Sequence, residues 1–217
     1  MLFSFNQTDG AYPNGGLVFD KMGNLYGTTA SGTTIASYGT VFRLSPPAAG
    51  KAAWTETTLF DFDKTDGANP DAGVILDAAG RLYGTTENGG TSSAGTVFRL
   101  TPPANGKTFW TETVLINFAG NNGDNPNAGL TLDKAGNLYG VTESGGGTAT
   151  QFGGNAFRLS PPAAGKSGWT ETILAGFKGA NGFFPVGSLI ADTAGNLYGT
   201  TYNGGKSGHG IVFKLTP

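Results

Sequence analysis

Several residue types that often carry protein chemistry are scarce or missing in this sequence. It has no cysteine, which excludes disulfides, thiolate metal sites and a cysteine nucleophile. It has only one histidine, which argues against a zinc site. Charged residues make up 13% of the 217 residues and the net charge is −2. We therefore expect no partner held by bulk electrostatics, and in particular no nucleic acid.

Long apolar runs are absent as well. No run approaches the roughly 20 residues that a membrane-spanning helix needs, so the sequence predicts no membrane insertion. The first ten residues, MLFSFNQTDG, contain neither a basic segment nor a long apolar segment. We therefore expect no signal peptide within this chain.

Glycine, in contrast, is abundant. The 38 glycines do not follow the period of collagen, and there are only 11 prolines. Hydrophobic residues make up 38% of the chain, which is enough for a folded core. Because no segment has helical periodicity, the composition predicts a turn-rich, all-β protein.

The chain consists of four copies of one unit, repeated every 56 to 59 residues. One segment of the unit reads GNLYGTT at 23–29, GRLYGTT at 80–86, GNLYGVT at 136–142 and GNLYGTT at 195–201. Another reads GTVFRL at 39–44 and 95–100, GNAFRL at 154–159 and GIVFKL at 210–215. W-T-E-T follows in the first three copies, at 54–57, 110–113 and 169–172. Repeats of this length are typical of propellers and solenoids.

Each copy contains four strand signals, which in the first copy are GLVFD (16–20), LYGTT (25–29), TVFRL (40–44) and WTETTLFDF (54–62). The first is mostly apolar, which suits a strand covered on both faces, and the fourth alternates polar with apolar residues, which suits an outer strand. Between the first two strands, Asp-x-x-Gly predicts a tight turn in which the aspartate accepts backbone N–H groups.

Four antiparallel strands per copy indicate a β-propeller of four-stranded blades, with a β-solenoid as the competing architecture. We expect one domain, residues 1–217, with blades at 6–62, 63–118, 119–177 and 178–217. Residues 1–5 match the end of the fourth strand of the other copies, so we predict that they close the last blade. The result is either a closed four-bladed ring or half of an eight-bladed ring formed by a homodimer.

These motifs resemble a known family. The string GNLYGTT…GG…GTVFRL, followed by W-T-E, is similar to the bacterial GloVer-type tandem repeat over essentially the whole chain. That resemblance implies a secreted or cell-surface protein and no assigned activity. The segment GLVFDKMGNLYGTT (16–29) also resembles NHL-type blades, a family that includes binding scaffolds and metal-dependent lactonases and triesterases, so this resemblance implies a fold rather than a reaction.

Residues that every copy shares are interpreted as structural. They include the turn aspartates Asp20, Asp77, Asp133 and Asp192, and the tyrosines Tyr26, Tyr83, Tyr139 and Tyr198. We expect the tyrosines to pack between blades with their hydroxyls satisfied nearby. The outer strands carry tryptophans, expected to cover the blade rim, and the glutamates Glu56, Glu112 and Glu171, expected to be solvated.

Function is predicted where loops of different copies meet on one face. The residue after each loop proline is expected nearest the axis, and these residues are Asn14, Asp71, Asn127 and Val186. Asn14, Asp71 and Asn127 are candidate ligands for Ca²⁺ or another divalent cation. Together with Glu87 and Glu143 they are also candidate ligand-binding residues. The alternative is that Asx-Gly and Asx-Pro form ordinary turns here.

The fourth copy carries the only histidine, His209, on a glycine-rich loop. It is either solvated surface or a catalytic general base in a pocket walled by Tyr202, Phe183 and Phe184, oriented by Asp71 or Glu87. Aromatic residues on these loops, Phe152 among them, are candidates for stacking on sugar rings, although loop packing also explains them.

Three functions stay open from the sequence. The first is a binding scaffold that recognises a neutral small molecule, a glycan or a protein through its Gly/Asn-rich loop face. The second is a metal-dependent hydrolase of esters, lactones or phosphotriesters with a cation near the axis. The third is a structural repeat module of a larger surface protein.

Overall fold

The protein is built from four blade-like antiparallel sheets, one for each sequence copy. This computed structural model describes residues 1–34, 37–104, 107–146 and 153–217. Consecutive strands are neighbours within every sheet. The first sheet contains β1 (Val18–Phe19), β2 (Leu25–Thr29), β3 (Thr40–Ser45) and β4 (Thr55–Asp61). The second contains β5 (Ile75–Leu76), β6 (Leu82–Thr86), β7 (Thr96–Thr101) and β8 (Thr111–Asn117).

The remaining two sheets follow the same order. The third contains β9 (Thr131–Leu132), β10 (Leu138–Thr142), β11 (Asn155–Ser160) and β12 (Thr170–Gly176). The fourth has three strands, β13 (Ile190–Ala191), β14 (Leu197–Thr201) and β15 (Ile211–Leu215), and a short 3-10 helix, η1 (Gly179–Asn181), precedes it. Within the described residues, no helix is long and apolar enough to cross a membrane.

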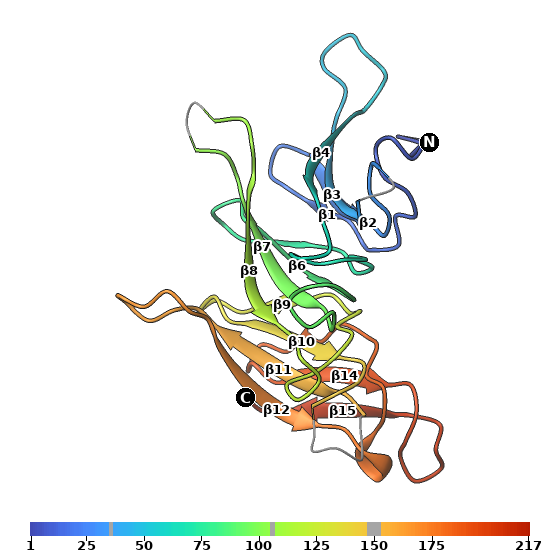
Figure 1. Cartoon of the computed structure of the whole chain (residues 1–217), viewed down its shortest axis with the longest axis vertical. Coiled ribbons are helices and arrows are strands. Elements are labelled where there is room, and N and C mark those ends of the chain that lie inside the picture. The colour runs from blue at the N-terminus through green and yellow to red at the C-terminus, as the bar shows by residue number, and fades with distance from the viewer. Residues whose placement is uncertain (35–36, 105–106, 147–152) are drawn as a thin grey trace.

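The sheets follow one another along the molecule, and the first and fourth lie at opposite ends (Figure 1). The connections from β3 to β4, from β7 to β8 and from β11 to β12 project outward in different directions (Figure 1). We call this open arrangement of successive sheets a fan. Opposite these projections, the inner strands and the residues before them line one common pocket. The all-β, blade-like architecture is thus confirmed, and the single chain forms an open fan rather than a closed ring.

Alternate side chains of each strand pack against the neighbouring sheets. Between the second and third sheets, Tyr83 and Val97 pack with Leu138 and Phe157 around Phe118. The hydroxyl of each repeated tyrosine donates to the aspartate of its own turn, for example Tyr83 to Asp77 Oδ2 at 3.1 Å. Satisfying the hydroxyl at the edge lets the ring stay buried, as predicted.

The inner strands are shorter than expected. The apolar segment 16–20 contributes only Val18 and Phe19 to β1, and the other copies likewise form two-residue strands. Gly15 shows the physical reason, because a Cβ built on it would lie 2.4 Å from the backbone nitrogen of Gly73 in the next copy. The backbones approach so closely near the axis that regular pairing ends early.

Residues 1–5 do not form a strand on the fourth sheet. Phe3 and Phe5 pack instead on the first sheet, next to Phe42 and Leu44. Closure of the last sheet within this one chain is therefore not observed, since the first and fourth sheets lie at opposite ends (Figure 1).

The expectation of solvated glutamates on the outer strands is wrong. Glu112 is half-buried, and burial, followed by the negative charge of Asp66, raises its pKa to about 7. Asn122 Nδ2 donates to Glu171 Oε2 at 3.1 Å in the third sheet. In both copies a side chain of the loop before the inner strand acts on the outer-strand glutamate, by its charge at Glu112 and by a hydrogen bond at Glu171. The alternating pattern did not reveal these interactions.

Candidate functional site

The residues that follow the loop prolines meet at the centre of the fan. Asn14, Asp71, Asn127 and Val186 all line a pocket of about 450 Å³, together with the inner strands. We call this pocket the hub. In all four copies the residue before the loop proline has a left-handed φ between 55° and 60°. The four loops therefore share one backbone conformation and place the residue after the proline in the same way. The structure brings these four predicted residues together, and their role in binding stays a prediction.

Amides and carboxylates are paired at the hub. Asn14 Nδ2 donates to Asp71 Oδ1 at 3.1 Å, and Asn127 Nδ2 donates to Glu143 Oε2 at 2.7 Å. Both bonds use the donor end of the asparagine. The buried Oδ1 of Asn127 has no hydrogen-bond partner among the described residues.

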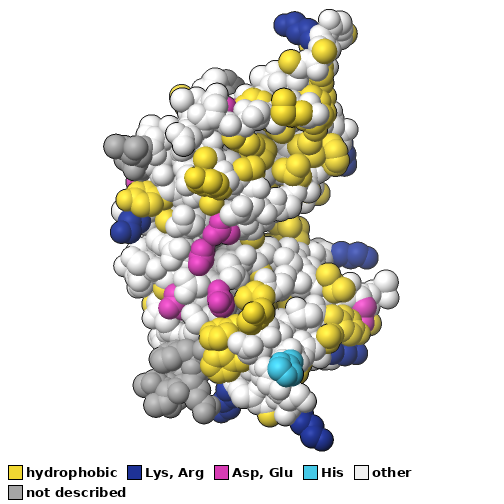
Figure 2. Space-filling view, turned by 90° about the vertical axis from the view of Figure 1, so that its right-hand side faces the viewer, with side chains coloured by type: hydrophobic (Ala, Val, Ile, Leu, Met, Phe, Trp, Pro, Cys, Tyr) yellow, Lys and Arg dark blue, Asp and Glu magenta, His cyan; other side chains and the backbone are white. Residues whose placement is uncertain are grey.

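Glu87 completes the polar group. Burial, then a hydrogen bond with Asp71 and the negative charges of Asp71 and Glu143, raises the pKa of Glu87 to about 7. Near neutral pH the Glu87 carboxyl therefore exists in protonated and ionised forms. Acidic side chains gather near the middle of the face in Figure 2, while Lys and Arg lie toward its edges. The site thus offers several acceptors and one carboxyl that can donate.

The Asp71→Asn substitution is expected to lower the pKa of Glu87 below 7. It removes the neighbouring negative charge, whereas burial, the largest cause, keeps that pKa above the value of a free glutamate. Carboxyl carbon shifts followed by NMR through a pH titration measure this change. Glu143→Gln removes only the more weakly acting charge and should have a smaller effect. An unchanged Glu87 titration in Asp71→Asn would show that the two carboxyls are not coupled.

Aromatic residues stand on the same loops in an unusual backbone conformation. Phe184 has φ of 57° and Tyr12 has φ of 60°, while the matching residues Asn69 and Asn125 both have φ of 55°. Asparagine tolerates this left-handed region, but a bulky residue there is strained. A position where the fold favours asparagine thus carries an aromatic ring in two copies.

The predicted aromatic wall is only partly assembled. The rings of Phe183 and Phe184 are 4.5 Å apart in an edge-to-face arrangement. Tyr202 is 70% exposed, and its backbone N–H donates to Phe184 O at 2.8 Å. Phe152 lies outside the described residues.

His209 is exposed, and no hydrogen bond joins its imidazole to Asp71 or Glu87. Its role as a general base stays a prediction. Within the described ranges, no three His, Asp or Glu side chains are grouped so as to hold a metal ion. Binding of Ca²⁺ by Asn14, Asp71 and Asn127 also stays a prediction, and the two asparagines turn N–H donors toward carboxylates.

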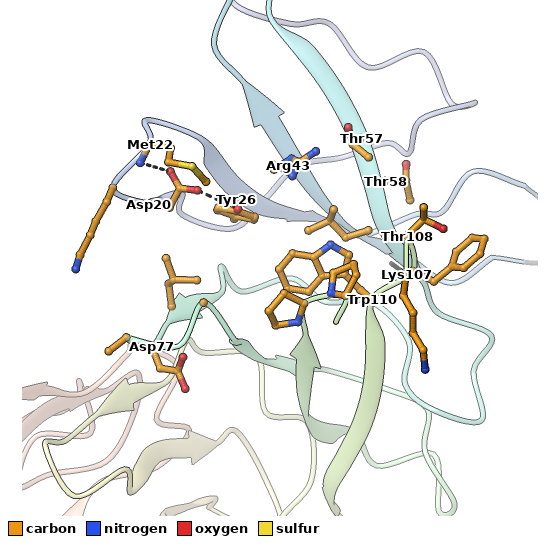
Figure 3. A pocket seen from close by; sticks show the side chains of 18 residues that line it. Asp20, Met22, Tyr26, Arg43, Thr57, Thr58, Asp77, Lys107, Thr108 and Trp110 are labelled. Carbon is orange, nitrogen blue, oxygen red and sulfur yellow. Dashed lines mark hydrogen bonds between the residues drawn. The ribbon is translucent and has the colours of Figure 1, made fainter. Parts of the chain in front are cut away.

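A larger pocket, of about 740 Å³, opens between the first and second sheets on the side of the Asp-x-x-Gly turns. Figure 3 shows Trp110 beside Tyr26 and Arg43, with Asp20 and Asp77 from two successive turns. The Trp110 and Tyr26 rings are 6.3 Å apart at 64°. Asp20 is not free to bind a ligand, because its four acceptor sites are used. It accepts from Met22 N and the Tyr26 hydroxyl (Figure 3), and also from the backbone nitrogen and Nδ2 of Asn24.

The same kind of pocket recurs between the second and third sheets. It has about 530 Å³ and is lined by Tyr83, Arg99 and Trp169, which match Tyr26, Arg43 and Trp110. Neither pocket was predicted from the sequence, because no local pattern marks the residues that line them. Phe109, which is 83% exposed, lies at the first pocket. Because the pocket repeats with shared residues, we attribute it to the divergence of neighbouring sheets away from the hub.

Comparison with known proteins gives one family. The model of the Gloeobacter/Verrucomicrobia repeat matches residues 1–150 and, in a second overlapping match, residues 105–217. The two matches together cover the whole chain. No curated protein matches it significantly.

Proposed function

This chain belongs to the Gloeobacter/Verrucomicrobia repeat family, and we propose that it is a repeat module that binds a glycan at the hub. The family match supports the repeat module. The observation that carries the binding proposal is the convergence of Asn14, Asp71 and Asn127, from three copies, on one pocket. Polar side chains that converge from separate copies on one accessible pocket are the usual mark of a binding site.

The chemistry of the hub favours a ligand rich in hydroxyl groups. Asp71 and Glu143 are acceptors for hydroxyl donors, while a protonated Glu87 donates to a hydroxyl or ring oxygen. Phe183 and Phe184 lie on the loop that leads to Val186 of the hub, and an aromatic ring offers a flat apolar surface for the face of a sugar. Phosphorylated and sulfated ligands fit poorly, because a cluster of carboxylates repels them.

The strained aromatic position supports the same proposal. Strain of about 1–3 kcal/mol persists only where the surrounding structure imposes it, and it is often found at binding sites. Phe184 lies two residues before Val186, which lines the hub. Retaining an aromatic ring here, where two other copies have asparagine, is explained by a contact with the ligand.

A glycan array followed by calorimetry with the best ligand tests the proposal. Asp71→Asn is expected to weaken binding about tenfold or more, because a hydrogen bond to a charged group contributes about 1.5–3 kcal/mol. Phe184→Asn should also weaken binding while keeping the loop, since Asn69 and Asn125 adopt the same φ.

The matched control is Glu112→Gln, compared with Glu87→Gln. Both glutamates have a pKa raised to about 7, but Glu112 lies on the outer strand β8, whereas Glu87 adjoins Asp71 at the hub. We expect weaker binding for Glu87→Gln and unchanged binding for Glu112→Gln. Equal affinities in all of these variants, or no glycan bound by the wild type, would contradict the proposal.

A secreted or cell-surface location belongs to the same proposal, since glycans are abundant at cell surfaces. Fractionation of producing cells, with detection of the chain in the surface or secreted fraction, tests it. Recovery from the cytoplasm alone would contradict it.

A further inference from the structure

The three interfaces between sheets repeat the same two surfaces. One, which we call the tyrosine face, comprises Val18, Tyr26 and Val41 in the first sheet, and its apolar residues pack on the second sheet. The other, the phenylalanine face, comprises Val74, Leu82 and Phe98 in the second sheet. The pairing recurs between the second and third sheets and between the third and fourth.

Among the sheets that the structure describes, none packs on the tyrosine face of the fourth sheet. Val212 is 79% exposed, whereas the matching residues Val41, Val97 and Ala156 are fully buried. Ile190, on the same face, is 68% exposed. An apolar face that is buried three times within the chain thus lies open at this end.

The phenylalanine face of the first sheet is open in the complementary way. Leu17 and Phe19 are 54% and 64% exposed, whereas Val74, which matches Leu17, is 4% exposed. One contact typical of a covered phenylalanine face is present, because the Phe5 and Phe42 rings lie 5.0 Å apart at 65°. The matching rings of Phe62 and Phe98 also lie 5.0 Å apart, at 66°.

Residues 1–5 therefore occupy the place where the outer strand of a preceding sheet would end. Phe62 directly follows β4, the outer strand of the first sheet, and packs on the second sheet. Phe5 packs on the first sheet in the same manner, but no β3-like strand lies beside it within the chain. Such a strand would pair with a sheet that has only three strands, and among the described residues the fourth sheet has three, β13, β14 and β15.

We propose that two chains associate. The fourth sheet of one chain packs its tyrosine face on the phenylalanine face of the first sheet of a second chain, and residues 2–5 of the second chain extend β15 of the first chain. The contact is head-to-tail. When this contact forms twice, it joins two chains into a ring of eight sheets around one hub. The proposal does not depend on the ligand proposed above.

Two further contacts are expected at this interface, each equivalent to one seen within the chain. Within the chain, Thr28 Oγ1 donates to Ala72 O of the next repeat unit at 2.9 Å, and Thr85 Oγ1 donates to Ala128 O at 3.0 Å. The matching residue in the fourth sheet, Thr200, is exposed, and we expect it to donate to Gly15 O of the second chain.

The second contact joins aromatic rings. Trp169 packs on Tyr83 of the preceding sheet, with ring centroids 6.3 Å apart. In the part of the chain that the structure describes, no tryptophan packs on Tyr198, and Lys214 Nζ lies 5.7 Å from its ring centroid. We expect Trp54 of the second chain to replace Lys214 over the Tyr198 ring.

Light scattering after size exclusion, over a range of concentrations, tests the contact. One chain has a mass of 22.1 kDa, so a closed pair has about 44 kDa, twice that value. A constant mass near this value supports the closed pair. Larger species that grow with concentration support the same contact in an open array. A monomer at all concentrations up to about 0.2 mM would overturn the proposal, because obligate apolar interfaces are tighter than that.

Substitutions on the two open faces test which surfaces meet. Val212→Lys and Leu17→Lys, each at an exposed residue, should give folded monomers by circular dichroism. Phe109→Lys, at another exposed apolar residue outside both faces, should leave the assembly unchanged. Mixing the Val212→Lys and Leu17→Lys variants should restore one contact and a mixed dimer, because each retains the face that the other lacks. A failure of mixing to restore association, or dimers in either variant alone, would exclude a head-to-tail contact.

Discussion

Replacing Phe98 by alanine is expected to lower the free energy of unfolding by about 3–5 kcal/mol, the usual loss for a buried phenylalanine. The Phe98 side chain is fully buried and contacts the Phe62 ring from the preceding sheet. It also lies across Gly84, its partner on β6, where a Cβ would come within 2.6 Å of the ring. Truncation therefore leaves a cavity bordered by two sheets and an uncovered strand glycine.

Urea unfolding followed by fluorescence and circular dichroism measures this loss. The control is Phe109→Ala, since Phe109 is 83% exposed and such surface changes stay within about 0.5 kcal/mol. A loss below about 1.5 kcal/mol for Phe98→Ala would mean that the sheets do not share one packed core.

Replacing Asp133 by alanine is expected to cost about 2–3 kcal/mol of unfolding free energy, through the loss of several charge-assisted hydrogen bonds. Asp133 accepts from the backbone nitrogens of Ala135 and Asn137 at 2.9 and 2.8 Å. It also accepts from Asn137 Nδ2 at 2.7 Å and from the Tyr139 hydroxyl at 3.1 Å. One carboxylate thus holds both the turn and the inter-sheet tyrosine, which is why every copy has one.

This cost should depend on pH. Burial alone would raise the pKa of Asp133, but the hydrogen bonds from Asn137 and Tyr139 outweigh it and hold that pKa below its usual value. The stabilisation is therefore present above the unfolded-state pKa of about 3.9 and is lost as the pH falls through the folded-state pKa. The difference between wild type and Asp133→Ala should shrink below about pH 4.

Thermal or urea unfolding at pH 7 and at pH 3 measures both effects. Lys134→Ala, an exposed change in the same turn, is the control and should alter stability at neither pH. An Asp133→Ala cost that is the same at both pH values would show that the charged carboxylate is not what stabilises the turn.

Much of the candidate site could be predicted from the sequence repeat. Residues that occupy matching positions after the loop prolines, such as Asn14 and Asp71, must occupy matching places in space if the copies pack alike, and they line one pocket. The turn aspartates and inter-sheet tyrosines follow from the same logic. The pKa of Glu87 does not, because it depends on which loops of different copies touch.

The errors have physical causes as well. Alternation along the outer strand suggested that Glu112 faces water, but this side chain is half-buried, and the charge of Asp66, from a loop of the same copy, also acts on it. The pocket around Trp110 was missed, since it arises from the angle between sheets. No local pattern encodes that angle.

The residue pattern alone establishes an all-β chain of four like units, the strands within each unit and the aspartate turns, because these depend on contacts between residues close in sequence. Packing between units decides the rest: that the fan stays open, that Val212 and Leu17 lie exposed at its two ends, and that carboxyls from different loops meet at the hub. These features depend on the angle between neighbouring sheets. That angle depends on contacts between residues far apart in sequence, such as the Phe62 and Phe98 rings.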